Sequence, residues 1–265
     1  MNDVLSRLFW LGPQWLCFLS GLYVLVFKFG TEEAKEALGN IAIGVIYSLF
    51  FGLFLSSSIE SYFSFFQAHH LFAIPLSVKT LPLYILVVDL GFYVQHRLFH
   101  RIPILWAAHS VHHTGLLITP SLFLRGNVFE VVFDVIFVAM PLMFVGFSPL
   151  GFFIAYQANL LHQSLTHNSW NWPDVLSRFL ITPQLHRVHH SQDPKDHNKN
   201  FGGLLSIWDL LFGTKAERMK GTRYGLQGFT SHNPVAMLLF VPRKLFRRVI
   251  DSGSLRVLLS PAGLQ

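Results

Sequence analysis

Cysteine is almost absent from this chain: among its 265 residues, only Cys17 is a cysteine. A single thiol excludes an internal disulfide and any metal site built from several cysteines. Charged residues are also scarce, at 13% of the chain, whereas a soluble domain of this size carries about 25%. This scarcity argues against an ordinary soluble enzyme, and the hydrophobic content of 52% argues against a disordered chain.

Long apolar runs take the place of charge. A membrane-spanning helix needs about 20 mostly apolar residues, and such runs occupy residues 8–29, 41–59, 76–95 and 128–147. A fifth run, residues 150–161, is short for a full span. The third run contains Pro82 and Asp89, and the fourth contains Glu130 and Asp134. The runs predict an all-α, multi-pass membrane helical bundle with about four spans and a short fifth apolar helix.

The basic residues predict how these spans are oriented. Arg7 and Lys79 are the only basic residues at one set of span ends, and all the others lie at the opposite ends or in the C-terminal part. By the positive-inside rule, residues 96–127 and 162–265 are expected to face the cytoplasm, in a bacterial inner membrane or the endoplasmic reticulum. The net charge of +6 then favours contact with anionic lipid headgroups over binding of nucleic acid.

Composition divides the chain into three parts. We expect N-terminal membrane helices in residues 1–75, a central domain that contains the clustered histidines in residues 76–232, and a basic amphipathic tail in residues 233–265. Within the tail, residues 235–249 combine an apolar face with a basic end. This pattern fits a helix lying in the membrane interface, and it fits a solvated terminal helix equally well.

Eight of the fourteen histidines are arranged in three sets. Residues spaced by three or four share a face of a helix, so each set is expected to aim its imidazoles at one point. All the sets fall on the predicted cytoplasmic side, which predicts a histidine-rich helical cap there. The sets are His96 and His100, then His109, His112 and His113, then His186, His189 and His190.

A metal site explains this repetition better than polar contacts at helix ends, which would account for a single histidine pair. His162 and His167 are further candidate ligands, and the sequence leaves open whether one or both bind metal. His69 and His70 lie on the predicted outer side, where contact with headgroups is the simpler reading. Imidazole suits iron, zinc, copper and nickel alike. Eight or more ligands are too many for one ion, so two ions are expected.

The histidines belong to a longer ordered set of motifs. The motifs are Asp89-x-x-x-Tyr93-x-x-His96-Arg97-x-x-His100, Trp106-x-x-His109-x-x-His112-His113, Thr182-Pro183-x-x-His186-Arg187-x-His189-His190, Asn200-Phe201-Gly202 and Trp208-Asp209-x-x-Phe212-Gly213-Thr214. In order and spacing, over about residues 81–214, they resemble the fatty acid hydroxylase/sterol desaturase superfamily of integral membrane di-iron proteins. The resemblance implies two Fe2+ ions held by the histidines, O2 as co-substrate, and a separate electron-donor protein.

The resulting hypothesis is a membrane di-iron oxidoreductase that uses O2 to hydroxylate a C–H bond of a lipid, such as a fatty acyl chain or a sterol. A lipid desaturase on the same scaffold is the main alternative. A histidine-rich metal transporter or sensor is less favoured, because a transporter places its ligands near the bilayer midplane. The basic tail offers an acidic electron donor a docking surface. The lipid itself is not readable from the sequence.

Asp89 is the candidate for orienting a ligand. It lies seven residues before His96, about two turns along the same helix face. A carboxylate there is expected to accept the free N–H of the His96 imidazole, as carboxylates near metal-binding histidines often do. The alternative is a charge satisfied by a neighbouring helix.

Overall fold

The computed structural model describes residues 13–28, 30–50, 56–126, 128–216 and 223–255. Helices follow one another along these segments, and the described residues form isolated β-bridges but no sheet, so the predicted all-α class is confirmed. Parts of the predicted elements lie outside the described residues: 1–12 with Arg7 and the start of the first run, residue 29, 51–55 of the second run, and 256–265 of the tail.

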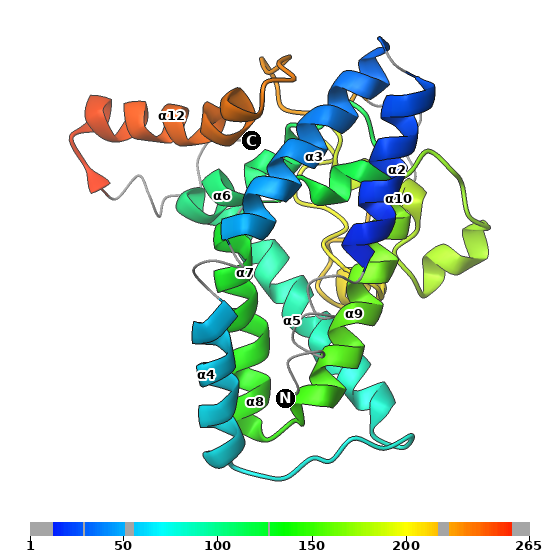
Figure 1. Cartoon of the computed structure of the whole chain (residues 1–265), viewed down its shortest axis with the longest axis vertical. Coiled ribbons are helices and arrows are strands. Elements are labelled where there is room, and N and C mark those ends of the chain that lie inside the picture. The colour runs from blue at the N-terminus through cyan, green and yellow to red at the C-terminus, as the bar shows by residue number, and fades with distance from the viewer. Residues whose placement is uncertain (1–12, 29, 51–55, 127, 217–222, 256–265) are drawn as a thin grey trace.

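A bundle of helices makes up the lower half of the molecule (Figure 1). It contains α4 (Ser56–Ala68), α5 (Leu81–Arg101), α8 (Met140–Val145) and α9 (Pro149–Thr166). Its core includes the buried side chains of Val88, Met143, Phe152, Ala155 and Leu160. This core holds α5 against α9, so the C-terminal ends of these two helices lie close together.

The predicted runs only partly match the helices. The first two correspond to α2 (Pro13–Phe27) and α3 (Glu32–Phe50), and the fifth is longer than predicted, because α9 reaches Thr166. The fourth run is not one regular helix. It consists of α7 (Val128–Asp134), a π-helical turn η3 (Val135–Ala139) and α8. Pro141 follows the π-helical turn and has no N–H to donate, which accounts for the local change of pitch.

Within the described segments, no helix combines the length and the apolar character that crossing a membrane requires.

A sharp break separates α5 from α6 (Pro103–His113). Ile102 is extended, with φ −101° and ψ 117°, because the residue before a proline disfavours the helical conformation. The chain therefore turns back, and α6 packs against the end of α5. This turn brings the first two histidine sets together.

The upper half carries α2, α3, the short η2 (Pro120–Leu124), α6 and α12 (Pro234–Ser252), with α12 projecting to one side (Figure 1). Met237, Val241 and Leu245 of α12 are buried in a core shared with α6. A second apolar stripe on α12 is exposed and consists of Val235, Leu239, Phe246 and Ile250. The helix therefore docks on the protein by one face and presents another apolar face outward.

The last histidine set lies in α10 (Pro183–His189). It is flanked by η4 (Asp174–Arg178) and by a loop that leads to α11 (Ile207–Leu211). Since α10 packs on α9, it places the last histidine set near the C-terminal ends of α5 and α9.

Candidate metal centre

The structure brings nine of the ten predicted histidine ligands together in two groups. Within each group the ligand atoms all lie within 4.8 Å of one another. The five-histidine group contains His96, His100, His109, His113 and His189. The four-histidine group contains His112, His167, His186 and His190.

Each H-x-x-H-H set serves both groups, which corrects the expectation that a set aims at one point. In α6, His109 and His113 belong to the five-histidine group, whereas His112 belongs to the other. In α10 the roles reverse, and His189 is the one that crosses to the five-histidine group. Residues four apart differ by about 40° around a helix, while the neighbouring residue turns away by about 100°. Because the two groups lie side by side, histidines of one helix that point in these two directions reach different groups.

The ring nitrogens of the five-histidine group lie close to one another in the protein interior. Nε2 of His96, His109, His113 and His189 is buried, and these atoms find no hydrogen-bond partner among the described residues. Buried polar atoms are nearly always paired in folded proteins. Four such atoms within 4.8 Å of one another therefore fit a cation-binding site.

Contacts in the four-histidine group give the same indication. Nε2 of His167 lies 2.9 Å from Nε2 of His112 and 2.8 Å from Nε2 of His186. Nε2 of His190 lies 3.1 Å from Nε2 of His186. Nitrogens converge here on nitrogens, and a bound metal ion would provide each of them with a shared partner.

The other ring nitrogen decides which atom can bind metal. Carbonyl oxygens accept hydrogen bonds but cannot donate, so a histidine whose Nδ1 faces a carbonyl carries its proton there and leaves Nε2 free. Nδ1 of His96 and His189 donate to the carbonyls of Phe201 (2.9 Å) and Lys199 (2.8 Å), and Nδ1 of His112 and His167 donate to those of Arg125 (3.3 Å) and Gln163 (2.7 Å).

Burial keeps these imidazoles neutral. Desolvation lowers the pKa of His109 to about 3 and that of His167 to about 4. It also lowers the pKa of His100, His113 and His190 well below the usual value for histidine. A metal ligand must be deprotonated, so both groups are ready to bind metal at neutral pH.

His162 lies outside both groups. Its Nε2 donates to the carbonyl of Ile181 at 2.7 Å, and its ring packs edge-on against Trp172. His167 is the residue directly after α9, and its Nδ1 caps a carbonyl in the last turn of that helix. His69, exposed and stacked on Phe65, also lies apart from the groups.

Asp89 forms no hydrogen bond with His96, so the expectation that it accepts the free N–H of that imidazole is wrong. Its carboxylate accepts from the backbone N–H groups of Leu204 and Leu205, from Nε1 of Trp208 and from the amide of Asn159. Leu204 and Leu205 belong to a loop more than 100 residues away in the chain, Trp208 to α11 and Asn159 to α9. Together these donors saturate the carboxylate. Asp89 therefore acts on the loop that supplies a carbonyl to His96.

Asp209 holds the same loop from its other side. Its carboxylate accepts from the N–H groups of Phe201 and Gly202, each at 2.8 Å, and from the hydroxyl of Thr214 at 2.6 Å. Because both carboxylates are buried and hydrogen-bonded, the loop is fixed between them. The carbonyls of Lys199 and Phe201, which orient two metal-binding histidines, are fixed with it.

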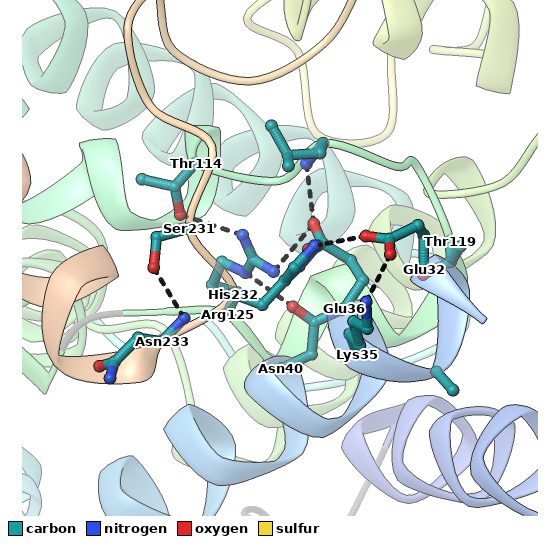
Figure 2. Close-up of polar contacts among 12 residues, drawn as sticks. Glu32, Lys35, Glu36, Asn40, Thr114, Thr119, Arg125, Ser231, His232 and Asn233 are labelled. Carbon is teal, nitrogen blue, oxygen red and sulfur yellow. Dashed lines mark hydrogen bonds and ion pairs between the residues drawn. The ribbon is translucent and has the colours of Figure 1, made fainter. Parts of the chain in front are cut away.

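Arg125 orients a histidine of the four-histidine group in a similar way (Figure 2). Its carbonyl accepts from His112, while its guanidinium is fully buried and forms an ion pair with Glu36 of α3 at 2.9 Å. The guanidinium also donates to Asn40 at 2.6 Å and to Thr114 at 3.0 Å. Glu36 in turn contacts His232 at 2.8 Å. This network ties α3 and the segment before α12 to the end of α6.

A cavity of about 460 Å³ opens beside both groups. Most of its wall is apolar, with Phe18, Ile41 and Val45 from α2 and α3 and Phe99 and Leu160 from the bundle. His96 and His109 of one group and His112, His167 and His186 of the other reach its surface. The cavity has the size and character of a site for an apolar ligand.

Several residues of this centre were not identified as site residues from the sequence. Glu130 lies 3.2 Å from Nδ1 of His109, and Arg125 and the two loop carbonyls orient other ligands. Acidic residues at the start of an apolar run, such as Glu130 and Asp134, were the one available signal. Backbone carbonyls carry no sequence signal at all.

Comparisons with known proteins identify one family and several relatives. Residues 81–214 match the family model described as Fatty acid hydroxylase. The chain is 34% identical to human alkylglycerol monooxygenase over 72% of this chain and 43% of that protein. It is 29% identical to ornithine lipid hydroxylase of Rhizobium tropici over 58% of this chain and 47% of that one, and 26% identical to human cholesterol 25-hydroxylase over 49% and 48%. The chain thus spans less than half the length of these relatives. No solved structure matches it.

Proposed function

The chain belongs to the fatty acid hydroxylase family, and from that premise we propose that it is a membrane-associated di-iron monooxygenase that hydroxylates a lipid. The relatives named above are lipid monooxygenases and hydroxylases, which supports an oxidoreductase that acts on lipids. The observation that carries the proposal is the division of nine buried histidines into two adjoining groups.

Iron is the metal we propose for both groups. Each offers neutral imidazole nitrogens, without cysteine, and imidazole suits redox-active iron as well as zinc. Four or five nitrogens in each group suit one ion apiece. When bound, two Fe2+ ions would supply the reduction of O2 and the cleavage of an unreactive C–H bond, with the protein providing placement and electrostatics.

The chain's own residues set the conditions for this chemistry. The carbonyls of Lys199, Phe201, Arg125 and Gln163 hold protons on Nδ1, so each Nε2 stays aimed at its group. The apolar wall of the cavity excludes water from the face of the groups that meets the substrate. A lipid chain in this cavity would lie directly against both groups.

Membrane association is part of the proposal. Large apolar side chains are exposed on the bundle helices, including Leu83 and Leu86 of α5, Phe144 of α8 and Ile154 of α9. Such surfaces mark contact with lipid or with other proteins. We place the bundle in the bilayer, with the histidine groups and the basic C-terminal part on the cytoplasmic side as the distribution of Lys and Arg predicts. The exposed apolar stripe of α12 would then lie in the interface.

The electrons are proposed to come from a separate donor protein. The basic residues Arg243, Lys244, Arg247 and Arg248 of α12 would attract an acidic partner. Whether the overall reaction is hydroxylation or desaturation is a difference in product, and we propose hydroxylation because the named relatives are hydroxylases and monooxygenases.

Lipid mass spectrometry on cells with and without the gene tests this function. The proposal predicts a lipid that gains one oxygen atom only in cells that express the intact protein, and not in cells that express His186→Ala. A product that has lost two hydrogen atoms would instead identify a desaturase. An unchanged lipid profile with a shifted metal content in the cells would favour a metal transporter.

A further inference from the structure

One face of α5 changes from apolar to basic along the helix. Its exposed side chains are Leu83, Leu86 and Val94, followed by Arg101, with the half-buried Arg97 between the last two. Spacings of three, four and eight residues place all five on the same face. An apolar helix face that ends in arginines is typical of the border between the hydrocarbon and the headgroups of a bilayer.

The two arginines have no acidic partner in the described part of the chain. Neither Arg97 nor Arg101 forms an ion pair with a carboxylate there. Asp89 of the same helix and Asp209 of α11 are buried and accept hydrogen bonds from other groups. Two cations four residues apart on a helix repel each other, so an anion bound by both would be stabilised.

Contacts hold the guanidinium of Arg97 in place. Its Nη1 donates to the hydroxyl of Tyr93 at 3.1 Å, and its central carbon lies 6.0 Å from the centre of the Tyr93 ring and 5.9 Å from that of Phe212. The two rings stack with their centres 5.2 Å apart. Nη2 forms no hydrogen bond with a described residue and is not buried. The side chain is therefore preorganised, with Nη2 open to a ligand.

Arg187 shows the contrasting case of an arginine with a structural role. Like Arg97, it directly follows a histidine of a metal-binding group. Its Nη1 donates to the carbonyls of Asn168 at 2.9 Å and Trp170 at 2.8 Å, and its Nη2 donates to the side chain of Asn171. Internal acceptors thus occupy both terminal nitrogens of Arg187, whereas Arg97 keeps one of them for a ligand outside the protein.

The end of α11 adds apolar surface beside Arg97. Phe212, the residue after α11, packs on Tyr93 of α5. The preceding Leu210 and Leu211 are exposed. Large exposed apolar side chains next to unpaired cations form the kind of surface that binds lipids with an anionic headgroup.

From these contacts we propose that Arg97 and Arg101 bind the phosphate of a bilayer phospholipid, whose acyl chains lie along the apolar face of α5. The proposal rests on the membrane placement given under the proposed function, and it adds a lipid site outside the cavity, because neither arginine lines that cavity. Phosphate suits the site because a guanidinium donates paired hydrogen bonds to its oxygens.

Such a site would fix the depth of the metal centre in the membrane. His96 and His100 directly precede the two arginines in α5. Consecutive residues of a helix point about 100° apart, so the histidines face the protein interior at the same level as the arginines. A phosphate bound by the arginines would therefore hold the five-histidine group at the level of the headgroups.

Binding of matched lipids tests the proposal without turnover. Full-length, iron-loaded protein is kept in a nonionic detergent, and native mass spectrometry measures the binding of dioleoyl phosphatidic acid and of dioleoylglycerol. The two lipids have the same acyl chains, and only the first carries a phosphate. Phosphatidic acid is expected to bind about 30-fold more tightly, the effect of two arginines on an anionic lipid.

Variants locate this preference. The double variant Arg97→Gln/Arg101→Gln should lose most of it. The control Lys195→Gln/Arg223→Gln removes the same charge at exposed positions outside this face, and it should keep the preference. If the first double variant fails to fold, Arg101→Gln and its control Arg223→Gln replace the two, and the preference should fall about fivefold in Arg101→Gln alone.

A photoreactive phosphatidic acid, with a diazirine in one acyl chain, tests the position of the site. Cross-linked peptides are expected from α5 and α11. Cross-links confined to the basic end of α12 would overturn the proposal, and so would displacement of the lipid by an equal concentration of soluble glycerol phosphate.

Two further results would contradict the site and leave the proposed function standing. One is equal binding of phosphatidic acid and dioleoylglycerol, or a preference that survives in Arg97→Gln/Arg101→Gln. The other is a dimer that this double variant abolishes, which would assign the face to a second copy of the chain. The proposed function fails separately, if the purified protein holds no iron and oxidises no lipid.

Discussion

His112 and His167 face each other with their Nε2 atoms 2.9 Å apart, although each donates its Nδ1 proton to a backbone carbonyl. When both imidazoles are neutral, neither Nε2 carries a proton, so the lone pairs of these two nitrogens point at each other. This arrangement is unfavourable by itself and becomes favourable once a cation lies between the two nitrogens. The two residues are 55 positions apart in the chain, so it is the fold that brings them into contact.

Metal-free protein should lose stability as the pH falls. Burial lowers the pKa of His109 to about 3 and of His167 to about 4, from 6.5 in the unfolded chain. Between these values the unfolded state binds more protons, so acid favours unfolding, by roughly 1 kcal/mol per pH unit for each such histidine. Unfolding of the metal-free protein measured at pH 7 and pH 5 should show the loss, and His69→Gln should show it equally. A stability that is flat over this range would contradict the neutral, buried state of the groups.

Arg125 should matter both for folding and for the four-histidine group. Arg125→Met leaves the buried Glu36 carboxylate without its guanidinium partner, and breaking a buried ion pair in this way typically costs about 3–5 kcal/mol. It also loosens the carbonyl that orients His112. The temperature of thermal unfolding and the iron content should both fall. The control Lys28→Met removes an exposed ion pair with Glu33, worth about 0–1 kcal/mol. An Arg125→Met protein as stable as the control would show that the network does not hold α3 to α6.

Asp89 should act through the loop and not through an imidazole. Asp89→Leu leaves the N–H groups of Leu204 and Leu205 and the indole of Trp208 without their acceptor. The loop carbonyls that orient His96 and His189 should shift, which lowers iron affinity or activity by about 10–100-fold. Asp89→Asn should lose less, and Asp174→Asn, at an exposed site, nothing. Full iron content and turnover in Asp89→Leu would leave Asp89 with a packing role alone.

His162 and His167 should behave differently. His167→Ala removes a member of the four-histidine group, whereas His162→Gln keeps a donor for the carbonyl of Ile181 outside that group. Iron content should fall by about one atom per chain in the first variant, one of the two groups, and stay unchanged in the second. Loss of iron from a folded His162→Gln protein would show that His162 belongs to the metal site.

Sequence patterns predicted the parts of this centre that local geometry controls. Helical spacing identified His109, His112 and His113 as neighbours on one side of α6, because rise and rotation per residue are fixed. Their division between two groups was not predicted, since it depends on His189 and His167 arriving from other helices. The choice between His162 and His167 depended on where α9 ends. Asp89 shows the same limit, because its backbone partners, Leu204 and Leu205, lie in a distant loop.

The most direct measurement is the metal content of the purified chain and of two adjacent single variants. The account predicts about two iron atoms per wild-type chain, one for each histidine group. His112→Ala and His113→Ala alter consecutive residues of α6 that belong to different groups. Each should lose about one iron atom and all activity, and Mössbauer spectra of the two variants should show different remaining sites. One tightly bound zinc per chain, or both variants losing the same single site, would contradict a centre with two metal ions.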